Sequence, residues 1–188
     1  LKQNYSNIAD LSYLENSNLF LEGTGSLVID HAQKIAYACL SNRTSANAID
    51  KWRSLTGYKV IEFTAQDDNN FPIYHTNVIL TLAHNFAIVC LDSIIPADKK
   101  RIENHLKSKG REIISISSEQ TKKFCGNCLA LKNRKDEQIL IMSEQARRNF
   151  TSHQIKTIET STKIISSDIS EIEFTGGGGA RCMIAELF

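Results

Sequence analysis

The sequence has few of the features that define several large protein classes. Among its 188 residues, no apolar run approaches the roughly 18 residues of a membrane-spanning helix. No long basic run occurs and the formal net charge is only +1, which argues against nucleic acid or an anionic membrane as a partner. The chain also lacks a GxSxG nucleophile elbow, a P-loop and an HExxH zinc motif, which excludes the enzyme classes built on those motifs.

Proline is scarce, with 2 residues, and the five cysteines are an odd number scattered along the chain. A globular chain of this length does not need disulfide bonds for stability, so we expect reduced thiols and a cytoplasmic protein. Glycine is modest at 9 residues, but four of them stand together at positions 176–179. This run is the strongest local anomaly in the sequence.

A recurring order of hairpin, helix and strand is the main pattern along the chain. Alternating and helical apolar spacings predict strands at residues 18–22, 27–30, 35–40 and 58–63, with a helix at 45–55 that stops at Gly57. The second pass predicts strands at 76–82, 86–90 and 112–116 with a helix at 97–108. The third predicts strands at 128–131, 139–142 and 163–166 with helices at 143–150 and 152–159, capped by Ser143 and Ser152.

The repeat length is roughly 50 residues, which is typical of stacked or propeller-like repeats. The pattern therefore predicts one α/β (α+β) domain over residues 1–188, built from repeated units. A simple α+β domain without repeats is the alternative, because residue identity between the passes is weak.

Cys182 is the first candidate for chemistry, because it follows the glycine run and Arg181 directly. Glycines allow a close backbone approach to a ligand, and a neighbouring cation favours the thiolate. A strand-like apolar segment, 182–188, follows instead of the polar sequence expected after a flexible connector. The alternatives are a flexible glycine connector and a buried structural cysteine.

His75 and Glu22 are two further candidates. His75 stands at the start of an apolar strand, where a proton carrier can face a cleft, although a surface histidine is the common alternative. Glu22 ends an apolar run before a glycine-rich turn and could bind a cationic or amide nitrogen, or simply belong to a hairpin turn. The single CxxC of Cys125 and Cys128 is a weak metal or redox signal, and we expect these thiols to be structural.

Four segments together resemble a known family. They are FLEGTGSLVIDH at 20–31, LSNRTS at 40–45, IYHTNVILTLAH at 73–84 and GGGGARCMIAELF at 176–188. In this order they resemble the amidinotransferase and arginine deiminase superfamily, the penteins, and most closely the bacterial arginine deiminase-related proteins that resemble citrulline hydrolases.

The resemblance implies a pentein-like α/β propeller of five ββαβ units, of which about three are present in this C-terminal portion of a catalytic domain. It implies catalytic roles for Cys182 as nucleophile, His75 as general acid and base, and Glu22 as a ligand of the substrate nitrogens. It also implies substrate-binding roles for Arg43, Asn77 and Gly25. Asn77 departs from the aspartate of many deiminases, and a neutral amide suits a neutral ureido group.

The expected function is a cysteine-dependent hydrolase that acts on C–N bonds of guanidino or ureido groups in arginine or citrulline, without a metal or organic cofactor. An amidinotransferase of the same fold is one alternative, and a non-catalytic fragment or binding module is another. The expected partners are a small amino-acid substrate and a missing N-terminal portion or partner chain, with a homodimer as a further option. No nucleic acid or membrane is expected.

Overall fold

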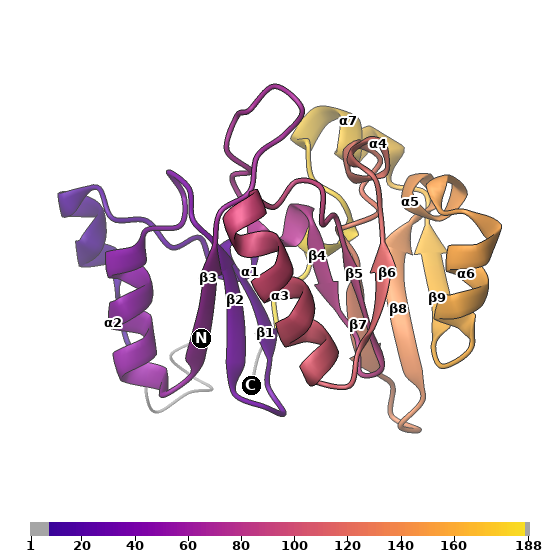
Figure 1. Ribbon diagram of the computed structural model, residues 1–188, viewed down its shortest axis with the longest axis horizontal. Helices are drawn as coiled ribbons and strands as arrows, with labels where there is room; N and C mark the ends of the chain where they lie inside the picture. Colours follow the sequence, from indigo (N-terminus) through magenta and orange to yellow (C-terminus); the bar gives the residue numbers. More distant parts are fainter. Residues whose placement is uncertain (1–7, 187–188) are drawn as a thin grey trace.

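The computed structural model describes residues 8–186, and it contains three ββαβ units in chain order (Figure 1). The first unit has β1 (Leu27–Asp30), β2 (Ile35–Cys39), α2 (Ala46–Thr56) and β3 (Lys59–Phe63). The second has β4 (Leu80–Leu82), β5 (Phe86–Val89), α3 (Pro96–Ser108) and β6 (Glu112–Ser115). The third has β7 (Leu129–Lys132), β8 (Gln138–Ser143), α5 (Glu144–Asn149), α6 (Ser152–Glu159) and β9 (Lys163–Ser167).

Each unit forms its own three-stranded sheet with the same topology. The first two strands pair antiparallel as a hairpin, and the third strand, after its helix, pairs parallel with the middle strand. The first strands of successive units contact each other, β1 with β4 and β4 with β7, so the sheets are arranged as a fan (Figure 1). The recurring order predicted from the sequence is therefore confirmed.

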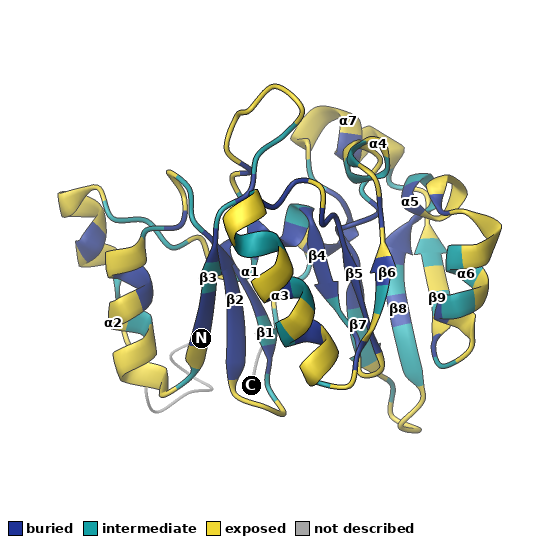
Figure 2. Ribbon diagram, in the orientation of Figure 1, coloured by how far each residue is buried: buried dark blue, intermediate teal, exposed yellow. Residues whose placement is uncertain are grey.

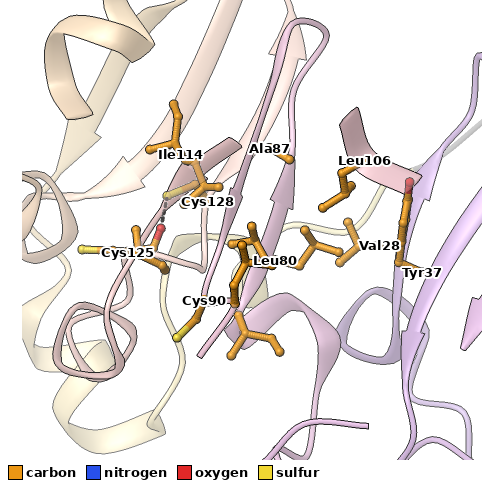
Figure 3. Close-up of a cluster of buried hydrophobic side chains, with 14 of the residues drawn as sticks. Val28, Tyr37, Leu80, Ala87, Cys90, Leu106, Ile114, Cys125 and Cys128 are labelled. Carbon is orange, nitrogen blue, oxygen red and sulfur yellow. Dashed lines mark hydrogen bonds between the residues drawn. The ribbon is translucent and has the colours of Figure 1, made fainter. Parts of the chain in front are cut away.

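Apolar side chains of all three units form one large core. The middle strands β2 and β5 are buried along their whole length, whereas the helices are exposed on their outer faces (Figure 2). Figure 3 shows part of this core, in which Cys90, Cys125 and Cys128 lie among aliphatic side chains. Within residues 8–186, no helix is long and apolar enough to cross a membrane.

The remaining short elements connect the units. They are η1 (Ser12–Ser17), α1 (Gly23–Ser26), η2 (Thr76–Val78), α4 (Ser118–Lys122), α7 (Ser170–Gly176) and η3 (Ala180–Met183). Of the predicted caps, Ser143 is confirmed, since its hydroxyl accepts a hydrogen bond from the amide of Ala146. Ser152 is wrong as a cap, because Thr151 takes that place in a capping box with Gln154. Gly57 ends α2 as predicted.

Three predicted strands are wrong in whole or in part. Residues 18–22 form no strand, and Leu21 makes only an isolated bridge with Thr44. Strand β4 begins at Leu80 instead of Thr76, because residues 76–78 form the turn η2. Cys182 lies in η3 instead of a strand, and the end of the predicted strand at 187–188 lies outside the described residues.

A buried ion pair joins the first unit to the second. The Arg111 guanidinium donates to the Asp30 carboxylate at 2.5 Å and to the carbonyl of Ala83 at 2.9 Å. Only 4% of the Asp30 side chain and 7% of the Arg111 side chain are exposed. Since a buried charge without its partner is costly, this pair constrains how the two units pack.

We predict that Asp30→Asn lowers the free energy of unfolding by about 3–5 kcal/mol, because it leaves the Arg111 charge buried without a counter-charge. Urea unfolding measures this change. Asp92→Asn is the matched control, because Asp92 pairs with Lys99 at the surface and its side chain is 77% exposed. The control should unfold close to the unmodified protein. Equal midpoints for both variants would contradict the prediction.

Candidate active site

Glu22, His75 and Arg43 form one cluster of charged side chains. Glu22 directly precedes α1, and His75 occupies the N-cap position of η2. The His75 Nε2 lies 2.7 Å from Oε2 of Glu22, and Nη1 of Arg43 lies 3.7 Å from the same oxygen. The cluster is open on one side, since 43% of the Glu22 side chain and 54% of the Arg43 side chain are exposed.

Gly25 determines where the His75 ring lies. A Cβ atom built on Gly25 would be 2.7 Å from the ring atoms Cε1 and Nδ1, so any other residue here would force the His75 ring or the backbone to shift. Gly25 is itself buried, so it forms the wall behind His75. Its predicted place near the substrate stays a prediction, and what the structure shows is a packing role.

Tyr74 connects this cluster to Cys182. Its ring lies under the Arg43 guanidinium, with 5.1 Å from Cζ to the ring centroid, and is tilted against the His75 ring at 4.9 Å. Burial raises the pKa of the Tyr74 phenol, the Cys182 thiol raises this pKa further, and the Arg43 charge lowers it. Tyr74 therefore lies against Arg43 and also lines one cavity together with Cys182.

Two asparagine side chains surround the Cys182 thiol. The Nδ2 of Asn127 lies 3.2 Å from Sγ and the Nδ2 of Asn77 lies 3.8 Å from it. Asn77 also donates to the carbonyl of Thr24 at 3.0 Å, which ties η2 to α1. Predicted site residue Asn77 thus lies against the thiol, two residues after His75. Among the described residues, no hydrogen bond joins His75 directly to Cys182.

The C-terminal part of the glycine run packs against the site, so the run is not simply a free connector. Gly179 is buried, and a Cβ atom on it would lie 2.8 Å from Oδ1 of Asn127. The amide of Cys182 donates to the carbonyl of Gly179 at 3.1 Å, which forms the turn that presents the thiol. Gly178 and Gly179 therefore allow the close approach beside Cys182, whereas a Cβ atom on Gly176 or Gly177 would meet nothing within 4 Å.

The Arg181 side chain does not point its charge at the Cys182 thiol, although the sequence suggested that it favours the thiolate. Its guanidinium donates to the Glu186 carboxylate and to the carbonyl of Ile184, both at 2.7 Å. Only 7% of its side chain is exposed. The Arg181 charge is therefore paired with Glu186, and the expectation that it favours the Cys182 thiolate loses its basis.

A cavity of about 210 Å³ opens beside Cys182. Tyr74, Asn127 and Gly177–Gly179 belong to its wall, together with Ile73, Val78 and Phe124. His75, Glu22 and Arg43 do not line it, so the predicted residues form two groups that meet at Tyr74 and η2.

Sequence reasoning missed Asn127 and Tyr74. Asn127 stands between Cys125 and Cys128, and those two cysteines gave the segment its only recognisable signal. Both thiols are buried, and burial raises the pKa of Cys125 to about 12 and that of Cys128 still higher. Over residues 8–186, no group of three or more histidine, cysteine or acidic side chains is arranged to hold a metal ion.

The model of one protein family matches residues 1–188, and its description is N,N dimethylarginine dimethylhydrolase, eukaryotic. The chain belongs to this family. No curated protein sequence matches the chain.

Solved structures show the same fold. The N-terminal domain of ArgZ, an arginine dihydrolase of the ornithine–ammonia cycle in cyanobacteria, superposes with a TM-score of 0.72 at 16% identity, over 96% of this chain and 60% of that one. The apo structure of ArgZ gives 0.75 at 16% identity, over 99% of this chain and 27% of that one. SxtG, an amidinotransferase of Microseira wollei, gives 0.56 at 15% identity, over 84% of this chain and 42% of that one.

These matches confirm the predicted superfamily and the pentein-like α/β fold. At such low sequence identity, the similarity to the solved structures establishes the fold alone. The matched region is 27% of the chain in the apo ArgZ structure and 60% of the ArgZ N-terminal domain.

We predict that iodoacetamide modifies Cys182 alone in the folded protein. Cys182 is exposed, whereas Cys39, Cys90, Cys125 and Cys128 are buried. Burial raises the pKa of Cys39 and of Cys125 to about 12, so these thiols stay protonated near neutral pH. Peptide mass spectrometry reads the modified positions, and the urea-unfolded protein is the control in which all five cysteines react. Modification of a second cysteine before unfolding would contradict this prediction.

Proposed function

We propose that this chain carries the catalytic part of a hydrolase that cleaves a C–N bond of the guanidino group in an arginine-like amino acid, with Cys182 as the nucleophile. One observation carries the proposal. A single turn, η2, presents His75 to Glu22 at 2.7 Å and Asn77 to the Cys182 sulfur at 3.8 Å. A thiol that accepts hydrogen bonds and a histidine held by a carboxylate at the same turn supply the nucleophile and the proton carrier that covalent catalysis uses.

In the proposed mechanism the Cys182 thiolate attacks the central guanidino carbon and forms a C–S bond. His75 gives its proton to the leaving nitrogen as the C–N bond breaks, and then takes a proton from the attacking water. Glu22 accepts hydrogen bonds from the guanidino nitrogens and holds the carbon between the thiol and the His75 ring. The second step breaks the C–S bond, which restores the thiol and leaves a ureido product.

The family and the charges of the site support a guanidino substrate. The family description supports N,N-dimethylarginine, which with water would yield citrulline and dimethylamine. Arginine itself would yield citrulline and ammonia, and it is bound by AgrE, a protein of similar fold. The exposed Glu22 carboxylate suits a guanidinium cation in either case.

Citrulline is the second candidate substrate, and Asn77 favours it. A neutral amide, where many deiminases have a carboxylate, lies beside the thiol. Hydrolysis of the ureido group would give ornithine, ammonia and carbon dioxide. Asn77 is also bonded to the carbonyl of Thr24, however, so its amide has a structural partner that does not depend on the substrate.

We also propose that further polypeptide covers the amino-acid end of the substrate. The Glu22 and Arg43 side chains are open to solvent on one side, and the chain corresponds to only 60% of the ArgZ N-terminal domain. In this proposal Arg43 turns from Glu22 to the substrate α-carboxylate, for which a guanidinium is well suited.

We predict that the full-length protein releases dimethylamine from N,N-dimethylarginine, or ammonia from arginine or citrulline, and that Cys182→Ala abolishes this turnover. His75→Gln should lower kcat by about 10²–10⁴-fold, since it removes the proton carrier. Citrulline, ornithine, ammonia and dimethylamine are measured for each substrate. Met183→Ala and His84→Gln are the matched controls, because both residues are exposed and lie outside the proposed chemistry.

The outcomes separate the alternatives. Turnover that survives Cys182→Ala would overturn the covalent mechanism. Transfer of the amidino group to an amine in place of water would favour an amidinotransferase. If none of the three substrates is turned over and Cys182 does not react with iodoacetamide, a non-catalytic binding module is favoured.

A further inference from the structure

Asn127 contacts both ends of the residue that we propose as nucleophile. Its Nδ2 lies 3.2 Å from Sγ of Cys182, and its Oδ1 accepts from the backbone amide of Cys182 at 3.4 Å. Its own carbonyl accepts from the amide of Arg181 at 3.4 Å. Only 1% of Asn127 is exposed, so its carboxamide is held in place by packing, whereas Cys182 itself is open to solvent.

The loop that carries Asn127 is fixed by packing. A Cβ atom on Gly126 would lie 2.2 Å from the carbonyl oxygen of Val78, so the loop touches the backbone of the second unit directly. The Thr81 hydroxyl donates to the carbonyl of Gly126 at 2.7 Å and accepts from the amide of Cys128 at 3.1 Å. The Cys-Gly-Asn-Cys segment thus places one carboxamide at the Cys182 thiol.

A chain of hydrogen bonds continues from Asn127 through the other units. Its Nδ2 donates to the carbonyl of Asn77 at 2.9 Å, and Asn77 donates to the carbonyl of Thr24 at 3.0 Å. Side chains from the second and third units and the backbone of α1 therefore meet at Cys182. A shift of any unit would move the sulfur relative to His75.

We propose that Asn127 is a positioning residue that orients Cys182 and stabilises its thiolate by donating an N–H to the sulfur. The proposal rests on Cys182 as the nucleophile of the proposed function. A carboxamide fits because it offers a donor for Sγ and an acceptor for the backbone amide on one planar group. Aspartate has the same shape, but it lacks the donor and brings a negative charge to the sulfur.

The test is the pH profile of Cys182 alkylation by iodoacetamide in full-length protein, for the unmodified chain and Asn127→Asp. Only the thiolate reacts, so the midpoint of the profile reports how strongly the site favours it. We expect the midpoint to rise by about one pH unit or more, so that alkylation near neutral pH slows by about tenfold. At high pH, where the thiol is ionised in both proteins, the difference should become small.

Asn149→Asp is the matched control, because Asn149 is an exposed asparagine that donates to the carbonyl of Gln145, away from the thiol. Its profile should match that of the unmodified protein. An unchanged midpoint in Asn127→Asp would overturn the proposal. If that variant does not fold, Asn127→Ser is measured instead, because its shorter neutral side chain cannot bridge the sulfur and the amide. A raised midpoint again supports the proposal, and an unchanged one overturns it.

The assay contains no substrate, so it separates this proposal from the proposed function. A protein without hydrolase activity can still show the midpoint shift, which would leave the role of Asn127 in thiol chemistry intact. If the protein is an active hydrolase but Asn127→Asp leaves the midpoint of Cys182 alkylation unchanged, the proposed function stands and the proposed role of Asn127 is wrong.

Discussion

The Thr76 hydroxyl makes the contact on which the site depends. It donates to the carbonyl of Ser26 at 2.5 Å and accepts from the amide of Cys39 at 2.7 Å, and Thr76 is completely buried. These bonds fix η2 between α1 and the end of β2. The residues on either side of Thr76 then have defined places, with His75 against Gly25 and Asn77 against Thr24. Because the polar groups are buried, losing either bond would leave one of them unsatisfied.

The repeated fold explains how distant residues meet. Each unit contributes the segment before its first strand, and the first strands are neighbours, so these segments converge at one end of the fan (Figure 1). Glu22, His75 and Asn127 come from the segments before β1, β4 and β7 respectively. Cys182 lies near the end of the chain in η3, which contacts β8, and its sulfur contacts Asn127. The site therefore depends on packing between units more than on any single unit.

The sequence predicted the regular elements well, because their signals are local. Apolar alternation located β1, β2, β5 and β6, and helical spacing located α2 and α3. It failed where distant partners decide the conformation. Thr76 leaves the strand pattern because its hydroxyl bonds to residues 37 and 50 positions away. Asn127 gave no signal, because its partner thiol lies 55 positions further along the chain. Arg181 was misjudged for a different reason, since its partner Glu186 is only five residues away, but adjacency to Cys182 drew attention to the thiol instead.

The central claim is that Cys182 forms a covalent bond to the guanidino carbon. The most direct measurement is the mass of the Cys182 peptide after full-length protein has been mixed with N,N-dimethylarginine, arginine or citrulline and quenched in acid during turnover. The account predicts an added mass on Cys182 with at least one substrate, equal to that substrate less its leaving amine. Steady turnover with an unmodified Cys182 peptide at every quench time, or an adduct on another residue, would contradict it.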